Sequence, residues 1–145
     1  MAKKDYEALK LEKQLCFPLY AASREVIKLY HNTLTDLNLT YTQYLVLMVM
    51  WENGQISEKE LGKKLFLDSG TLTPVLKSLE KKGFIVRERS KTDERVVNVS
   101  LTEAGTKLKD DAVGIPKQIT DSIPLSGEDY DALYALLYKL LDGIE

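Results

Sequence analysis

The chain has 145 residues, of which 44% are hydrophobic and 29% are charged, which is typical of one globular domain with a hydrophobic core. One cysteine and one histidine exclude an internal disulfide framework and a zinc or iron–sulfur site of the usual ligand number, so we expect no metal and no cofactor. The first residues lack an apolar signal region, and the longest apolar run, residues 44–51, falls far short of the roughly 18 residues that span a membrane. We therefore expect a cytoplasmic protein without membrane contact.

Charge is distributed unevenly along the chain. The net charge is −2, but residues 77–95 hold seven cations against four anions, which gives this stretch a charge of +3. A basic element on an acidic body suits a surface that contacts phosphate at one place.

The N-terminal third has a helical pattern that is interrupted by Pro18. Apolar residues between about 9 and 37 recur at helical spacing. A proline in the helix interior would remove a backbone hydrogen bond, so the segment is expected to kink or to begin its regular helix near Pro18, with Cys16 close to a helix N-terminus. A deeply buried helix should follow over residues 40–52 and end at Asn53-Gly54.

Two short helices come next, at the spacing of a helix-turn-helix. The run Ser57-Glu58-Lys59-Glu60 is a capping box that predicts the start of the first helix. Asp68 or Ser69 can cap the second, which is expected to begin at about Gly70 and to stop at Gly83.

Beyond Gly83 the pattern predicts strands at residues 84–89 and 95–101, joined by a polar turn at 90–94, which makes a β-hairpin with a charged tip. Thr102 and Ser126 can cap two further helices, the first of them broken near Pro116. This order predicts a mainly α fold with a small β-hairpin.

We interpret the whole as a winged helix-turn-helix over residues 40–101, flanked by N- and C-terminal dimerisation helices at 9–38 and 102–143, within a single domain of residues 1–145. The apolar stripes of the terminal helices could be covered by intramolecular packing alone. However, helix-turn-helix proteins usually read a two-fold operator as dimers with half-sites about 34–36 Å apart, so we expect a homodimer.

Several motifs, spread over nearly the whole chain, resemble one known family. They are Leu15-Cys16-Phe17, Leu19-Tyr20-Ala21-Ala22-Ser23-Arg24, Leu39-Thr40-Tyr41-Thr42-Gln43-Tyr44, Leu67-Asp68-Ser69-Gly70-Thr71-Leu72-Thr73-Pro74, and Asp93-Glu94-Arg95 followed by Ser100-Leu101-Thr102. Together they look like the MarR family of transcriptional regulators, and more narrowly its one-cysteine branch that senses organic hydroperoxides, the OhrR regulators.

The resemblance implies a homodimeric repressor that binds double-stranded operator DNA and leaves it when an organic hydroperoxide oxidises Cys16. A thiolate is the nucleophile toward a peroxide, and a helix N-terminus with phenolic donors favours that ionised form. By the resemblance, Tyr30 and Tyr41 reach Cys16 from the partner subunit, and Tyr20 lines the same pocket. Because the chain has no second cysteine, the sulfenic acid must be captured by a small cellular thiol, by a backbone nitrogen or by further peroxide.

The expected DNA-reading residues lie on the second helix of the helix-turn-helix and on the hairpin. The helix from Gly70 to Lys82 would lie in the major groove, with four side chains near bases or phosphates: Ser69, Thr71, Thr73 and Lys77. The resemblance places Arg95 at the hairpin, oriented by Asp93, where it can enter the narrow minor groove. Arg87 and Arg89 are expected to contact or steer toward the phosphate backbone.

Other functions stay open at this point. One is a MarR-type regulator that is released by a phenolic or drug-like ligand, with Cys16 incidental; another is a redox-sensing virulence or biofilm regulator of the same family, since the residues after the cysteine are shared with such relatives. A thiol peroxidase is less well supported, because the chain lacks a resolving cysteine and any His or Arg beside Cys16 in sequence, although Arg24 could approach in space. The sequence thus favours a regulator that is not an enzyme.

Overall fold

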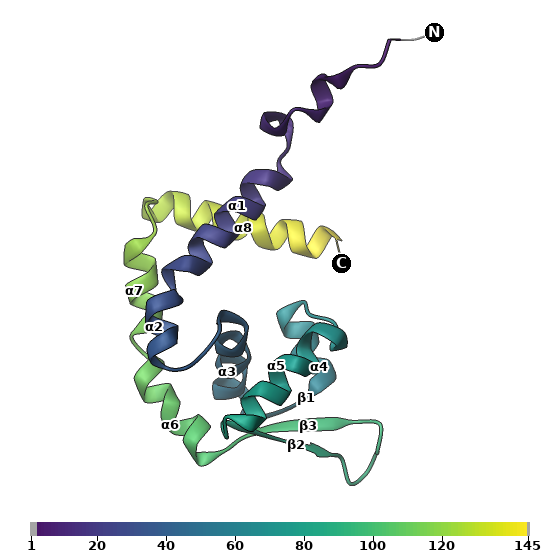
Figure 1. The fold of residues 1–145 in the computed structure, drawn as a ribbon, viewed down its shortest axis with the longest axis vertical. Helices are drawn as coiled ribbons and strands as arrows, with labels where there is room; N and C mark the ends of the chain where they lie inside the picture. Colours follow the sequence, from purple (N-terminus) through teal and green to yellow (C-terminus); the bar gives the residue numbers. More distant parts are fainter. Residues whose placement is uncertain (1–2, 145) are drawn as a thin grey trace. The chain divides into compact units, whose positions relative to one another are not determined.

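The computed structural model describes residues 3–144, which form helices and one small sheet (Figure 1). Two compact units make up the chain, Met1–Ile115 and Pro116–Glu145. The first unit contains the predicted sensor cysteine and every residue that we expect to contact DNA.

Helix α1 (Cys16–Leu29) begins at the cysteine, as the position of Pro18 predicted. Pro18 lies in the first turn, where its missing N–H removes no intrahelical bond. The helical region expected over 9–37 is interrupted, because two short 3₁₀ helices, η1 (Tyr6–Leu9) and η2 (Leu11–Lys13), precede α1, and Tyr30 separates it from the short helix α2 (His31–Asp36).

Helix α3 (Tyr41–Asn53) forms the centre of the first unit. Val46, Leu47 and Met50 on this helix are completely buried. Its N-terminus is closed by a capping box between Thr40 and Gln43 that the sequence analysis did not recognise, and Gly54, at φ 74°, ends it as predicted.

Helices α4 (Glu58–Leu65) and α5 (Ser69–Lys81) form the helix-turn-helix. The Ser57 hydroxyl accepts a hydrogen bond from the Glu60 amide at 3.2 Å, which is one half of the expected capping box. Asp68 caps α5 by accepting from the Thr71 amide at 2.8 Å, so α5 begins one residue earlier than expected. Gly83, at φ 84°, follows its end.

A three-stranded antiparallel sheet lies beside these helices, with strand order β1-β3-β2. Strands β2 (Ile85–Arg89) and β3 (Val97–Leu101) are the predicted hairpin, which extends from the sheet as a wing (Figure 1). Strand β1 (Gln55–Ser57) was not predicted, because three residues are too few to show an alternating pattern; it pairs Ile56 with the fully buried Val99 of β3.

Helix α6 (Glu103–Ala112) begins at the predicted cap, Thr102. The predicted break near Pro116 is present, since α7 (Ile115–Ser122) starts there, and Ser126 caps α8 (Gly127–Ile144) as expected, accepting from the Asp129 amide at 3.1 Å. None of the helices within residues 3–144 is both long and apolar enough to cross a membrane.

Candidate redox sensor and nucleic-acid interface

Cys16 lies at the first position of α1 with its side chain exposed. Its neighbours Leu15 and Phe17 are 75% and 43% exposed, so the thiol is flanked by uncovered apolar groups. The amides of a helix's first turn and the helix dipole favour negative charge at this end. The thiol is therefore accessible from solvent at the end of the helix where the backbone amides are free.

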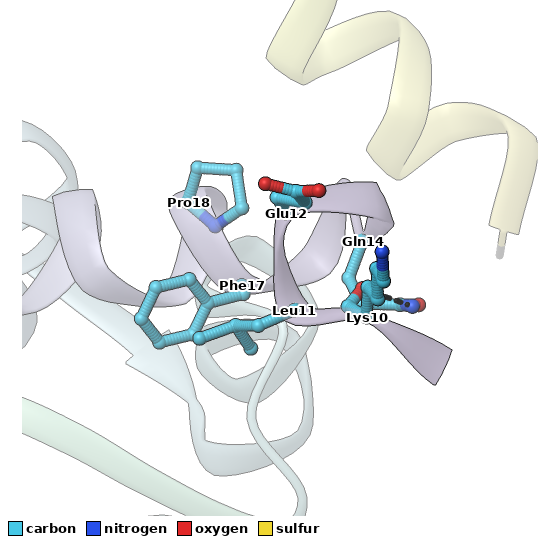
Figure 2. Close-up of a pocket in the computed structure, with 6 residues that line it drawn as sticks. All are labelled: Lys10, Leu11, Glu12, Gln14, Phe17 and Pro18. Carbon is cyan, nitrogen blue, oxygen red and sulfur yellow. Dashed lines mark hydrogen bonds between the residues drawn. The ribbon is translucent and has the colours of Figure 1, made fainter. Parts of the chain in front are cut away.

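A groove of about 660 Å³ lies next to this position (Figure 2). Leu11, Phe17 and Pro18 supply its apolar part, and Lys10, Glu12 and Gln14 its polar part. Gln14 fixes the preceding turn, because its side-chain amide donates to the carbonyl oxygens of Lys10 and Ala8 at 3.0 and 2.6 Å. The groove beside Cys16 is thus open and lined by both apolar and polar groups.

Three tyrosines form a cluster where the end of α1 meets the start of α3. The Tyr30 ring lies 4.9 Å from that of Tyr41 and 5.8 Å from that of Tyr44, centroid to centroid. Burial raises the pKa of Tyr41 above the ordinary 10.0, and burial together with nearby Tyr41 raises the pKa of Tyr44. Both phenols are therefore protonated at neutral pH and can donate hydrogen bonds.

Cys16 and this tyrosine cluster lie at opposite ends of α1. Cys16 is the first residue of the helix and Tyr30 its C-cap, a separation of about 21 Å at about 1.5 Å per residue. Tyr20, one turn after Cys16, shares its face of the helix, and the Arg24 guanidinium lies 5.5 Å from the Tyr20 ring centroid. The structure therefore brings Tyr30 and Tyr41 together but leaves them far from the cysteine of their own chain.

Helix α5 has one buried face and one polar face. Leu72, Leu76 and Leu79 are at most 2% exposed. Of the predicted DNA-reading residues on this helix, Ser69, Thr71 and Lys77 are exposed and Thr73 is half-buried. A polar helix face of this kind fits a major groove.

At the tip of the wing, Arg95 is 90% exposed and held by Asp93. Its Nε and Nη2 atoms donate to the two carboxylate oxygens of Asp93 at 3.1 and 3.3 Å. These bonds hold the pKa of Asp93 below its usual value. Arg89 closes the turn by donating to the Glu94 carbonyl at 2.8 Å. The expected orientation of Arg95 by Asp93 is present.

Arg87 is less exposed than a side chain that contacts phosphate needs to be. Its guanidinium forms ion pairs with Glu58 at 3.2 Å and with Glu80 at 3.4 Å, and its side chain is only 21% exposed. Its backbone amide also donates to Glu80, at 3.0 Å. Arg87 thus ties the wing to α4 and α5.

The sequence analysis overlooked Gln43. This side chain, 5% exposed, donates to the Ser78 hydroxyl at 2.8 Å and accepts from Lys82 Nζ at 2.9 Å. The Thr-x-x-Gln spacing from Thr40 was the available signal for its capping role, but the spacing carries no information about α5.

A model of the transcriptional regulator SarA/Rot family matches residues 28–112 of the chain. The chain is similar to the organic hydroperoxide resistance transcriptional regulator of Bacillus subtilis (strain 168), at 51% identity over 139 residues, which are 96% of this chain and 95% of the relative. It is also similar to the HTH-type transcriptional regulator SarZ of Staphylococcus aureus (strain MRSA252), at 47% identity over 116 residues, which are 80% and 78% of the two chains.

Among solved structures, the chain is similar to reduced AbfR bound to DNA, with a TM-score of 0.80 and 33% identity over 95% of this chain and 94% of that one. AbfR, a protein of Staphylococcus epidermidis, has also been solved in an overoxidised form bound to DNA and in a disulfide form, with TM-scores of 0.77 and 0.65 to this chain.

Proposed function

The chain belongs to the MarR family of winged helix-turn-helix transcriptional regulators, and from this membership we propose that it represses transcription from an operator and releases that operator when an organic hydroperoxide oxidises Cys16. The observation that carries the proposal is the exposed thiol at the start of α1, beside a partly apolar groove, in a chain so similar to an organic hydroperoxide resistance regulator. The chain acts in the cytoplasm as a DNA-binding switch and not as an enzyme.

The sensing chemistry has two steps. The Cys16 thiolate attacks the outer oxygen of the hydroperoxide, the O–O bond breaks, and the departing alkoxide takes up a proton, so that the sulfur becomes a sulfenic acid and the peroxide an alcohol. A small cellular thiol then attacks the sulfenic sulfur, giving a mixed disulfide and water. AbfR in its overoxidised form is bound to DNA, so we do not assign release of the operator to overoxidation of Cys16.

The sensor site is completed across a homodimer. Tyr30 and Tyr41 are about one helix length from the Cys16 of their own chain, so the thiolate to which they donate is that of the partner subunit, and Tyr20 lines the same pocket. The uncovered apolar side chains of α1 support a dimer, because monomeric proteins rarely expose such a surface.

DNA is read by α5 and the wing. Ser69, Thr71, Thr73 and Lys77 face the major groove, and Arg95 enters the minor groove in the orientation that Asp93 fixes. Arg89 steers toward the phosphates. Arg87, whose charge is already neutralised by two carboxylates, contributes by holding the wing against α5.

A second candidate function, release by a phenolic or drug-like ligand, is favoured by the groove at Lys10–Pro18. A thiol peroxidase has less support, because Arg24 is about 12 Å along α1 from Cys16 and lies over Tyr20. The experiment must therefore distinguish release by oxidation of Cys16 from release by a ligand bound in this groove.

The deciding experiment is a gel-shift titration on the DNA upstream of the chain's own gene, with the parent and with Cys16→Ser. We expect both reduced proteins to bind equally, because a hydroxyl replaces a thiol almost isosterically, and only the parent to be released by cumene hydroperoxide plus free cysteine, because a hydroxyl is not ionised at neutral pH. Mass spectrometry should find the added mass on Cys16, and a dithiol should restore binding.

If cumene hydroperoxide releases Cys16→Ser as readily as the parent, the cysteine is not the sensor. Release of both proteins by salicylate, with no response to hydroperoxide, would instead establish the ligand-controlled regulator.

A further inference from the structure

Gln43 stands out as a polar side chain inside an apolar core. Among residues 3–144 it is the one polar or charged residue that is buried, at 5% exposure. Its amide is bonded at both ends, since Oε1 accepts from the Thr40 amide at 3.0 Å and from Lys82 Nζ at 2.9 Å, while Nε2 donates to the Ser78 hydroxyl at 2.8 Å.

These bonds join two elements with different tasks. Thr40 and Gln43 form the N-terminus of α3, which carries Tyr41 as its first residue. Ser78 lies in the C-terminal half of α5, next to the exposed Lys77, and Lys82 is the C-cap of that helix. Gln43 therefore connects the tyrosine cluster with the recognition helix.

Lys82 reinforces the connection through the turn that precedes α3. Its Nζ atom also donates to the Asn38 carbonyl at 2.6 Å, and Asn38 has a left-handed backbone with φ 58°. The end of α5 is thus held both by this turn and by Gln43. The Tyr41 ring lies 4.9 Å from the ring of Tyr30, the C-cap of α1, so the chain of contacts continues to the helix that Cys16 begins.

This network is centred on a buried amide and resists partial movement. A buried donor or acceptor, such as those of Gln43, is costly to leave without its partner. A displacement of the α3 N-terminus must therefore move the C-terminal half of α5 with it or break these bonds. Either result changes how α5 presents its polar face.

We propose that Gln43 is a positioning residue that couples the oxidation state of Cys16 to the placement of recognition helix α5. The coupling rests on the proposed function, because it requires oxidised and reduced protein to differ in operator affinity. It assigns to Gln43 a role in the transmission of the signal, separate from the oxidation of Cys16 and from contact with DNA.

The test measures the ratio of the operator dissociation constants of the oxidised and reduced full-length protein, which for typical allosteric couplings is about 5 to 150. The variants are Gln43→Met, which removes the amide, and Ser78→Ala, which removes one partner and leaves the capping box intact. The matched control is Trp51→Phe, which removes a different hydrogen bond of α3, the 2.9 Å bond from Trp51 Nε1 to the Gly105 carbonyl on α6.

We expect the ratio to fall to about one fifth of the parent's in Ser78→Ala, which loses one bond, and at least as far in Gln43→Met, which loses all three, since one such bond is worth a factor of about that order. The rate of Cys16 oxidation by cumene hydroperoxide should stay that of the parent. Trp51→Phe should lower the melting temperature about as much as Ser78→Ala does, but it should keep the parent ratio. If Gln43 had only a structural role, the three variants would all keep the parent ratio.

If the parent responds to hydroperoxide and Ser78→Ala and every folded Gln43 variant keep its ratio, Gln43 does not couple the two sites and the inference is wrong. A parent whose affinity is the same in both redox states overturns the proposed function and this inference together. The response of the parent protein to hydroperoxide therefore distinguishes failure of this inference from failure of the proposed function.

Discussion

Arg95 is held in one orientation but is too exposed to stabilise the fold, which suits a side chain that binds another molecule. It is 90% exposed, and an ion pair at such a position contributes little to stability. Its partner Asp93 has a lowered pKa because it accepts from the Arg95 guanidinium and amide. A lowered folded pKa means that the pair is intact at neutral pH and is lost only as pH falls through a value below the ordinary 3.8.

We predict that Arg95→Ala weakens operator binding by about 1–3 kcal/mol, because it removes the guanidinium that we propose enters the minor groove. The melting temperature should not change, since the pair is exposed. Fluorescence anisotropy with labelled operator measures the affinity, and Lys107→Ala is the matched control, an exposed cation on α6 paired with Glu103. Equal affinity of Arg95→Ala and parent would remove the wing from the DNA interface.

Among the elements, the junction of β3 with α6 is held by close backbone contacts. The Thr102 amide donates to the Phe84 carbonyl at 3.1 Å, and the Thr102 hydroxyl donates to the Gly83 carbonyl at 2.6 Å. Gly105, in the first turn of α6, is so close to Phe84 that an added Cβ would overlap the Phe84 carbonyl oxygen. The helix can therefore pack here only because residue 105 has no side chain.

We predict that Gly105→Ala lowers the free energy of unfolding by about 1–3 kcal/mol or more, because a backbone carbonyl cannot move aside as a side chain can. Urea unfolding followed by circular dichroism measures this. Gly114→Ala is the control, since nothing lies within 4 Å of its Cβ position, and it should be neutral or slightly stabilising. Equal midpoints for the two variants would contradict the proposed close packing.

At the scale of the whole molecule, the terminal helices α1 and α8 leave their apolar side chains unburied. Neither α1 nor α8 contains a buried residue within the described part of the chain. On α8 alone, exposed large apolar side chains include Leu133, Leu136 and Leu140. These surfaces fit a helical interface with a second copy of the chain.

We predict that Leu136→Glu shifts the protein from dimer to monomer, because each copy loses the burial of a leucine, about 1.5–3 kcal/mol, and gains a charge in an apolar interface. Sedimentation velocity over a dilution series measures the dissociation constant. Val86→Glu is the control, because it places the same charge on another exposed apolar residue, 40% exposed, on the wing strand β2. A Leu136→Glu protein that stays dimeric at the parent's concentrations would exclude α8 from the interface.

The sequence by itself determined the features that depend on residues within a few positions of one another. The caps at Thr102 and Ser126 and the stops at Gly54 and Gly83 are local hydrogen bonds or backbone conformations, so their residue types were sufficient to predict them. The hairpin of the wing and the start of α1 at the cysteine were predictable for the same reason. For α5 the residue types left Asp68 or Ser69 as the cap, and the structure decided for Asp68, with the helix beginning one residue before the expected Gly70.

Only the tertiary structure decided the contacts between residues far apart in the chain. The pairing of β1 with β3, the bond from Gln43 to Ser78 across 35 positions, and the ion pair of Arg87 with Glu58 across 29 positions depend on how the elements pack. The residues next to a glutamine, a serine or an arginine in the sequence do not reveal whether its side chain is solvated or buried. The packing of α3, α5 and the wing thus decided which polar side chains hold the molecule together and which stay free to meet DNA.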